Sequence, residues 1–156
     1  VDYYFSKFDA IMEKYDVEKI KTIGDAYMCV SGLPEPGEND VFRAVEAAFE
    51  IVEFIEESKK TKMTDLTRFD IRIGINTGPI VAGVVGTKKF AYDIWGDTVN
   101  VASRMESKSE AGKINVSEST YELIKDHYDC EFRGEIDVKN KGMMKMFFVN
   151  AKKKVE

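Results

Sequence analysis

The sequence predicts an α+β domain with a mostly antiparallel β-sheet, and three observations lead to this class. Apolar residues recur at helical spacing in some segments, while in others they alternate with polar residues as in half-buried strands. The two kinds of segment interleave, and hairpin turns join several of them, which favours antiparallel pairing. The length of 156 residues, 44% of them apolar, suits one domain, so we expect a single domain over residues 1–156.

The chain opens with a helix and a hairpin. The apolar face of this amphipathic helix consists of Tyr4, Phe5, Phe8, Ile11, Met12 and Tyr15. The runs Val17–Ile23 and Ala26–Gly32 predict two short strands. Gly24 and Asp25 between them are typical of a tight turn, so we expect the strands to form a hairpin.

A second helix and an alternating strand follow. Asn39 or Asp40 can cap this helix. Its apolar face consists of Val41, Val45, Ala48, Phe49, Val52 and Ile55. A polar connection is expected over Ser58–Thr67, and the alternation of apolar and polar residues predicts a strand over Phe69–Asn76.

The second half of the chain continues the same interleaved pattern. The expected elements are strands over Ile80–Val85 and Phe90–Asp93, a helix from Asp97 to about Lys108, a strand over Lys113–Val116, a short helix from Ser117 or Ser119, and strands near Glu131–Val138 and Met144–Val149. The sequence shows neither repeats nor low-complexity segments.

Composition excludes several classes of function. The net charge of −5 argues against duplex nucleic acid as the main partner, because neutralising phosphates requires a basic face. Two cysteines, Cys29 and Cys130, are too few for a disulfide scaffold, and a single histidine, His127, excludes chemistry that relies on several. No run approaches the roughly 20 apolar residues of a membrane span. We expect a soluble domain from a reducing compartment.

Three segments carry more polar character than folding requires, and the first is the hairpin with Lys21 and Asp25. Aspartate favours hairpin turns and bonds its own backbone, so a turn role for Asp25 is the simpler alternative to metal binding.

Another of the three, the third in the chain, is the loop with Lys139 and Lys141, where lysines often serve only solubility or edge protection. A phosphate-binding role would require these lysines to face Arg104, which spacing alone leaves open.

The second segment is the helix that starts at Asp97. Asp97, Asn100 and Arg104 are three and four residues apart and therefore share one helix face. Asp97 can serve as an N-cap, but asparagine is a poor former of helix interiors unless its amide is used. Arg104 offers a planar, permanently charged donor group suited to phosphate. The alternative is a polar helix face with an incidental arginine.

Together, four segments closely resemble the catalytic domain of class III nucleotide cyclases, the adenylyl and guanylyl cyclases. The matching segments are 18–34, 73–86, 92–105 and 138–142, and the likeness extends from residue 1 to about residue 150. The resemblance implies a ferredoxin-like, mostly antiparallel sheet with helices packed on it. It also implies attack of the ribose 3′-hydroxyl on the α-phosphate, which releases pyrophosphate and leaves a 3′,5′-cyclic nucleotide.

The resemblance also assigns roles to individual residues. Asp25 matches one of two aspartates that hold two Mg²⁺ or Mn²⁺ ions. Asn100 then orients the ribose, Arg104 stabilises the α-phosphate, and Lys139 binds the terminal phosphates. Asn140 departs from the glycine often found in that loop, which bears on the shape of the loop rather than on Lys139.

Two further matched residues bear on the base. Lys21 can donate to N1 of adenine, and Asp93 can accept from its N6 amino group. Guanylyl cyclases typically carry glutamate and cysteine at these two positions. The pair in this chain therefore favours ATP as the substrate, and we expect an adenylyl cyclase that produces cyclic AMP.

One part of the family pattern is not matched. The family's first strand carries a metal-binding aspartate in an Asp-Ile-x-Gly-Phe-type segment, and neither Asp2 nor Asp9 lies in such a context. We expect an N-terminally truncated, cytoplasmic catalytic domain that is weak or inactive, with membrane contact only through segments outside this chain. A complete domain should form a homodimer, and a monomer is the alternative for this chain. The alternative function is an inactive pseudo-cyclase that binds a nucleotide or a partner domain.

Overall fold

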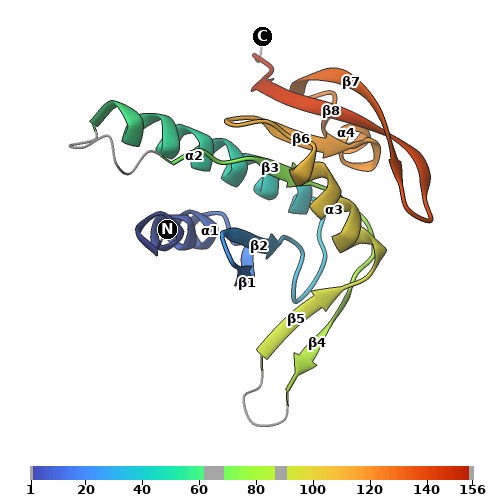
Figure 1. Ribbon diagram of the computed structural model, residues 1–156, viewed down its shortest axis with the longest axis horizontal. Coiled ribbons are helices and arrows are strands. Elements are labelled where there is room, and N and C mark those ends of the chain that lie inside the picture. Colours follow the sequence, from blue (N-terminus) through green and yellow to red (C-terminus); the bar gives the residue numbers. More distant parts are fainter. Residues whose placement is uncertain (1, 62–68, 87–90, 155–156) are drawn as a thin grey trace.

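A computed structural model describes residues 2–61, 69–86 and 91–154, and Figure 1 shows its arrangement. In chain order, the elements are α1 (Asp2–Lys14), β1 (Glu18–Ile23), β2 (Ala26–Val30), α2 (Asp40–Thr61), β3 (Ile73–Ile75), β4 (Val81–Val85), β5 (Ala91–Trp95), α3 (Asp97–Ser107), β6 (Ile114–Ser117), α4 (Glu118–Ile124), β7 (Tyr128–Val138) and β8 (Gly142–Lys152). No helix in these residues is long and apolar enough to cross a membrane.

The described strands form three sheets. The largest has the order β3-β6-β8-β7, in which β3 and β6 run parallel and the other neighbours run antiparallel. β1 pairs with β2, and β4 with β5, as two separate antiparallel hairpins. The predicted α+β class with mostly antiparallel pairing is therefore confirmed, although the sheet is divided into three parts.

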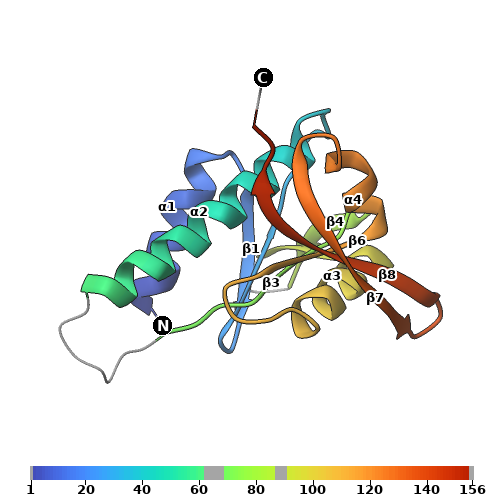
Figure 2. The ribbon, with the colours of Figure 1, turned by 90° about the horizontal axis from the view of Figure 1, so that it is seen from above.

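Helices cover both faces of the four-stranded sheet (Figure 2). Ile114 and Val116 of β6 pack with α2 and α4, and both are at most 2% exposed. Because neighbouring residues of a strand point to opposite faces, Asn115 between them faces α3 instead, where it contacts Met105. α1 packs beside α2 through an aromatic cluster around the fully buried Phe8. The sheet thus separates α3 from the main helical layer.

Several element boundaries differ from the predicted ones. α2 continues to Thr61, where a connection was expected from residue 58. Within these turns the hydroxyl of Ser58 donates to the carbonyl of Ile55, so the polar side chain is accommodated without ending the helix. The rest of that predicted connection, 62–67, lies outside the described residues. β3 covers only three residues, since Phe69 and Ile71 pack against the cluster around α1 and α2 instead of extending the strand.

The later strands are shifted or longer than predicted. β5 begins at residue 91 and ends at Trp95, and Phe90 of the predicted strand lies outside the described residues. β7 and β8 each contain 11 residues and are the longest strands described. Their pairing continues from Tyr128 opposite Lys152 to Val138 opposite Gly142, so the hairpin reaches well beyond the apolar core that the sequence pattern detects.

Candidate active site

The helix α3 carries two of the predicted site residues on its exposed face. Asn100 and Arg104 are one helical turn apart and both are exposed. The opposite face contains Val101 and Met105, which are 2% and 0% exposed and pack against the end of the β7–β8 hairpin. The amphipathic sequence of α3 thus buries its apolar face and presents the asparagine and the arginine outward.

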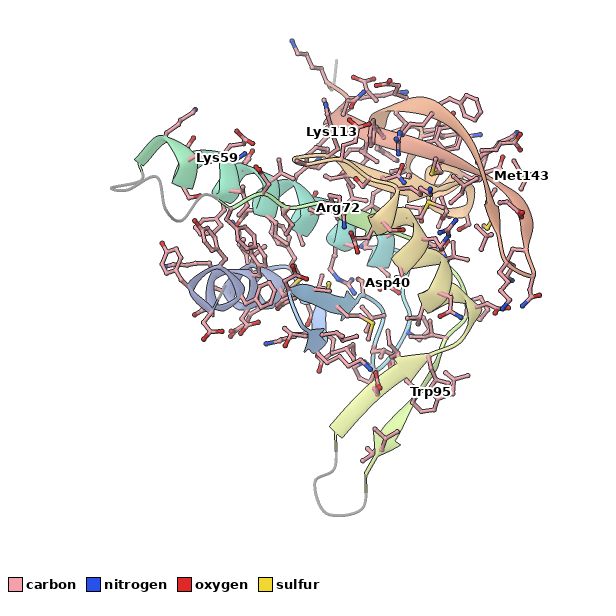
Figure 3. The ribbon with its side chains drawn as sticks, viewed as in Figure 1. Asp40, Lys59, Arg72, Trp95, Lys113 and Met143 are labelled. Atoms are coloured by element: carbon pink, nitrogen blue, oxygen red, sulfur yellow. The ribbon has the colours of Figure 1, made fainter. Side chains whose placement is uncertain are left out.

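The C-terminal half of α3 lies directly on the sheet. A side chain at Gly74 in β3 would place its Cβ atom 2.0 Å from the main-chain nitrogen of Glu106, so only glycine permits this approach. The guanidinium of Arg72 lies 2.8 Å from the Glu106 carboxylate, and Figure 3 shows Arg72 between β3 and α3. The amide of Asn115 donates to the carbonyl oxygen of Met105 at 2.9 Å. These contacts fix the turn that carries Arg104.

Arg104 also joins α3 to the β7–β8 hairpin. Its Nη2 atom donates to the carbonyl oxygen of Asp137 at 3.2 Å. At the same hairpin, the Lys141 ammonium lies 3.3 Å from the Asp97 carboxylate. The loop with Lys139 and Lys141 is therefore next to the helix that carries Arg104, a placement that the sequence left open. This end of the domain thus carries three cationic residues, Arg104 on the helix and Lys139 and Lys141 on the loop.

Asn140 fits the turn of this hairpin. Its φ angle of 67° is in the left-handed region, which asparagine adopts more readily than most residues other than glycine. The Lys141 N–H donates to the carbonyl of Val138 at 2.8 Å and closes the turn. The departure from glycine at this position is therefore compatible with a tight loop that holds the exposed Lys139 at its tip.

Asp97 is not the N-cap of α3, which corrects the sequence interpretation. It is the first helical residue, Gly96 precedes it as the cap, and no side chain caps this helix end. The Asp97 carboxylate pairs with Lys141 instead. A negative charge in the first turn is still favourable, because it lies near the positive end of the helix dipole.

Lys21 and Asp93 contact each other across two hairpins. The Lys21 ammonium on β1 donates to Oδ2 of Asp93 on β5 at 2.8 Å. Oδ1 of the same carboxylate accepts from the Ile94 N–H at 2.8 Å. The hydrogen bond from Lys21, helped by the one from Ile94, lowers the pKa of Asp93 below its usual value. The pair predicted from the sequence is thus brought together, and the hydrogen bonds favour the ionised form of the Asp93 carboxyl.

Asp25 stands alone at the tip of the β1–β2 hairpin. It is exposed and follows Gly24, whose φ of 58° forms the turn. The part of the chain that the structure describes contains no group of three or more histidine, cysteine, aspartate or glutamate residues able to hold a metal ion. One exposed carboxylate does not satisfy the six or more oxygen ligands that a hard divalent cation requires. The described residues therefore do not complete a metal site.

The site residues form two groups. Lys21 and Asp93 make one group, while Asn100 and Arg104 make another with the β7–β8 loop. Within the described residues, no hydrogen bond or ion pair joins Asn100 or Asp25 to the other predicted site residues. The structure therefore shows a contact between Lys21 and Asp93 and one between Arg104 and the β7–β8 hairpin, and a common centre stays a prediction.

The residues that support α3, namely Gly74 and Asn115, were not predicted from the sequence as part of the site. A signal for Asn115 was present, because an asparagine between Ile114 and Val116 interrupts an apolar strand. A polar side chain in such a run is either exposed or specifically hydrogen-bonded, and this one is fully buried. Gly74 carried no comparable signal, since its partner is 32 positions away in the sequence and becomes apparent only in the folded chain.

Comparison with known proteins gives the family. Residues 1–151 match the family model of the adenylate and guanylate cyclase catalytic domain. The chain belongs to this family. The resemblance seen in the sequence is therefore confirmed for almost the whole chain.

Curated relatives of this cyclase domain carry both activities in their names. An adenylate cyclase of Mycobacterium tuberculosis is 40% identical over 153 residues, which are 98% of this chain and 34% of the relative. A receptor-type guanylate cyclase of Caenorhabditis elegans is 43% identical over 155 residues, with 95% of this chain and 14% of the relative covered. The chain thus spans about a third or less of these relatives, one of which is named an adenylate cyclase and the other a guanylate cyclase.

Solved structures of cyclase domains show the same fold. The guanylate cyclase domain of a Catenaria anguillulae protein in complex with GTP is 42% identical with a TM-score of 0.88, covering 97% of this chain and 82% of that one. The adenylyl cyclase CyaB of P. aeruginosa is 32% identical, also with a TM-score of 0.88, covering 96% and 79%. The fold is therefore that of a class III cyclase domain.

Proposed function

We propose that this cyclase domain is an adenylyl cyclase, which converts ATP into 3′,5′-cyclic AMP and pyrophosphate. The observation that carries the proposal is the Lys21–Asp93 pair, a cation and an anion 2.8 Å apart on facing hairpins. Adenine presents an acceptor at N1 next to a donor at N6, which complements an ammonium beside a carboxylate. Guanine presents the reverse order, a donor at N1 and an acceptor at O6, so each of its groups would meet a group of its own kind.

In this proposal, two residues of α3 and one of the β7–β8 loop bind the sugar and the phosphates. The amide of Asn100 holds the ribose so that its 3′-oxygen faces the α-phosphorus. The 3′-oxygen forms the new bond to phosphorus, the bond to the pyrophosphate oxygen breaks, and the hydroxyl proton passes to solvent. The guanidinium of Arg104 stabilises the charge that develops on the α-phosphate, and Lys139 binds the terminal phosphates.

We assign Asp25 the role of one carboxylate ligand of a divalent cation, Mg²⁺ or Mn²⁺. A complete enzyme would hold two such ions per site. When bound, such ions neutralise phosphate charge and polarise the reacting oxygens. Asp25 alone does not hold them. The other ligands would have to be phosphate oxygens, water and a carboxylate that the described residues do not include, so no catalytic step is assigned to a metal held by these residues.

The proposed assembly is a symmetric homodimer. Apolar side chains are exposed together on the β4–β5 hairpin and at the β1–β2 tip, with Val81, Val84, Val85, Trp95 and Ile23 each at least 42% exposed. Figure 3 shows Trp95 on β5, the strand that also carries Asp93. Large apolar side chains exposed in this number on neighbouring hairpins are typical of an interaction site. A second copy that covers it would bring its own Asp25 towards a site otherwise open to solvent.

A second candidate function rests on Asp25 as the one matched metal carboxylate. Under this alternative, the domain binds a nucleotide or a partner cyclase domain without turnover. It predicts selective binding of ATP over GTP and no cyclic product with either metal.

One experiment separates the two functions. The purified chain is incubated with ATP or GTP and Mg²⁺ or Mn²⁺, and cyclic products are quantified while calorimetry measures nucleotide binding. Metal-dependent production of cyclic AMP from ATP, with little cyclic GMP from GTP, supports the adenylyl cyclase. Binding of ATP without product supports the second candidate, and a preference for GTP in both measurements contradicts the assignment of Lys21 and Asp93.

A further inference from the structure

Asn76 lies where β3, α3 and α4 meet. Its Nδ2 atom donates to the main-chain carbonyl of Thr98, in the first turn of α3, at 3.0 Å. Its Oδ1 atom accepts from the hydroxyl of Ser117, at the end of β6, at 2.5 Å and from that of Ser119 at 3.2 Å. The partly buried amide therefore uses its donor on α3 and its acceptor on the β6–α4 junction.

The loop after β3 adds a second connection to the same turn. The hydroxyl of Thr98 donates to the carbonyl of Pro79 at 2.5 Å, and a Cβ atom at Gly78 would lie 2.7 Å from that hydroxyl. The loop is held from the other side as well, because the Ser119 hydroxyl donates to the carbonyl of Thr77 at 2.8 Å and shares its one proton with the longer contact to Asn76. The first turn of α3 is thus hydrogen-bonded to a loop that is itself held in place by α4.

The two ends of α3 depend on different residues. Gly74 and Asn115 fix the turn around Met105, next to Arg104. Asn76 fixes the turn at Thr98, two residues before Asn100. A change at Asn76 should therefore move Asn100 while Arg104 keeps its place.

We propose that Asn76 is a positioning residue that sets the placement of Asn100 through the Thr98 carbonyl. This inference rests on the proposed role of Asn100 in holding the ribose. A geometric error of about 1 Å at a reacting group can cost roughly 100-fold in rate. A substitution that breaks the contact between Asn76 and Thr98 should therefore lower the turnover rate, and not only the stability of the fold.

The test uses Asn76→Asp, which preserves the shape and the acceptor for Ser117 but replaces the Nδ2 donor by an oxygen that faces the Thr98 carbonyl. Ser119→Ala is the matched control, because it removes a hydroxyl that donates to Oδ1 of the same amide and to the carbonyl of Thr77, and leaves the contact with Thr98. Amide hydrogen exchange of the full chain is the first measurement. We expect faster exchange at residues 98–102 in Asn76→Asp only, with residues 103–107 and the β7–β8 hairpin unchanged. Uniform exchange along α3, or equal effects in both variants, would overturn the proposal.

Turnover supplies the second measurement, as a double-mutant cycle. In the proposal, Asn76→Asp lowers kcat by about 10- to 100-fold with little change in KM. It adds almost nothing in an Asn100→Ala background and its full factor in a Lys139→Ala background. Additive effects with Asn100→Ala would refute a role through that residue.

Two safeguards keep the test decisive. If Asn76→Asp fails to fold, Asn76→Ala is measured in the same way, since it also lacks the donor and introduces no charge. If the chain produces no cyclic nucleotide at all, the proposed function fails, while hydrogen exchange at residues 98–102 still decides whether Asn76 positions α3.

Discussion

The helix α3 and the two small hairpins, β1–β2 and β4–β5, support the proposed site in different ways. α3 lies on the four-stranded sheet with Met105 fully buried, and side chains hold both of its ends. The hairpins are separate two-stranded sheets, and the Lys21–Asp93 ion pair connects β1 with β5. Residues proposed for bond making thus stand on a fixed helix, while those for base choice and metal binding stand on exposed hairpins.

This difference fits the demands of the two tasks. Bond formation requires catalytic groups held to within about 0.5 Å, which a helix packed on a sheet can provide. A base or a second protein copy must enter and leave, which an open hairpin surface permits. The comparison therefore predicts that variants of α3 damage turnover, while variants of the hairpins change selectivity, metal dependence or assembly.

The largest expected effects come from one residue in each region. Arg104→Ala should nearly abolish turnover, because the α-phosphate loses its fixed cation. Asp25→Asn should abolish metal-dependent turnover and leave the melting temperature unchanged or higher, since an exposed carboxylate without a ligand contributes little to folding. Product formation and thermal melting measure both. A large loss of stability in Asp25→Asn with activity retained would show that Asp25 serves only the turn.

Mixing these two inactive variants then tests whether the regions act across a dimer. In a symmetric homodimer with shared sites, one of the two sites of a mixed dimer contains neither substitution. Random pairing places about half of the dimers in the mixed form, so activity should return to roughly a quarter of the wild-type level. Mixed dimers without any activity would exclude shared sites.

The hairpin pair controls the next effect, the choice of base. Lys21→Glu combined with Asp93→Cys should shift the preference from ATP towards GTP by orders of magnitude, because the wrong base leaves polar groups unpaired. The ratio of kcat/KM for the two nucleotides measures the shift. Lys21→Glu alone is the control and should impair both nucleotides, since two carboxylates would then face each other. An unchanged ratio in the double variant would refute base reading by this pair.

Gly74→Ala tests how closely α3 must approach the sheet. The new Cβ atom would lie 2.0 Å from the backbone of Glu106, so the helix must move away. We expect a loss of about 1–3 kcal/mol in the free energy of unfolding, measured by urea denaturation, together with reduced turnover. Gly37→Ala is the matched control, because its Cβ would meet Asp40 at an ordinary 3.5 Å. Equal stability in the two variants would contradict the tight contact.

The smallest effect concerns the ion pair and pH. The pKa of Asp93 is lowered in the folded domain, so its contribution to stability is present above its unfolded pKa of about 3.9 and is lost as the pH falls through the lower folded value. Wild type should therefore melt slightly higher than Asp93→Asn at pH 6 to 8, and the gap should close below about pH 4. A gap that changes near pH 7 would point to another group.

Local patterns predicted the elements well, because their causes are local. The α1 face around Phe8 and the turn at Gly24 follow from spacing within a few residues. The division into three sheets did not follow, since the parallel pairing of β3 with β6 joins Ile73 to Ile114, 41 positions away. Nothing in the short apolar run of β3 specifies that partner.

The same limit applies to the site. Helical spacing placed Asn100 and Arg104 on one exposed face, as the structure has them, and their functional roles stay predictions. The contacts that hold α3 could not be foreseen, because Asn76 reaches Thr98 over 22 positions and Ser117 over 41. A polar residue at the end of a strand is common, and only the fold shows which groups it joins.

The partner of Arg104 has a consequence for how a nucleotide reaches the domain. Arg104 donates to a neutral carbonyl, and in the described residues no carboxylate neutralises it. The chain as a whole carries a net charge of −5 and repels anions at long range. At physiological ionic strength, however, charges are screened beyond about 8 Å, so an arriving polyphosphate responds mainly to the uncompensated cation nearest to it. Added salt should therefore weaken nucleotide capture, even though it relieves the overall repulsion.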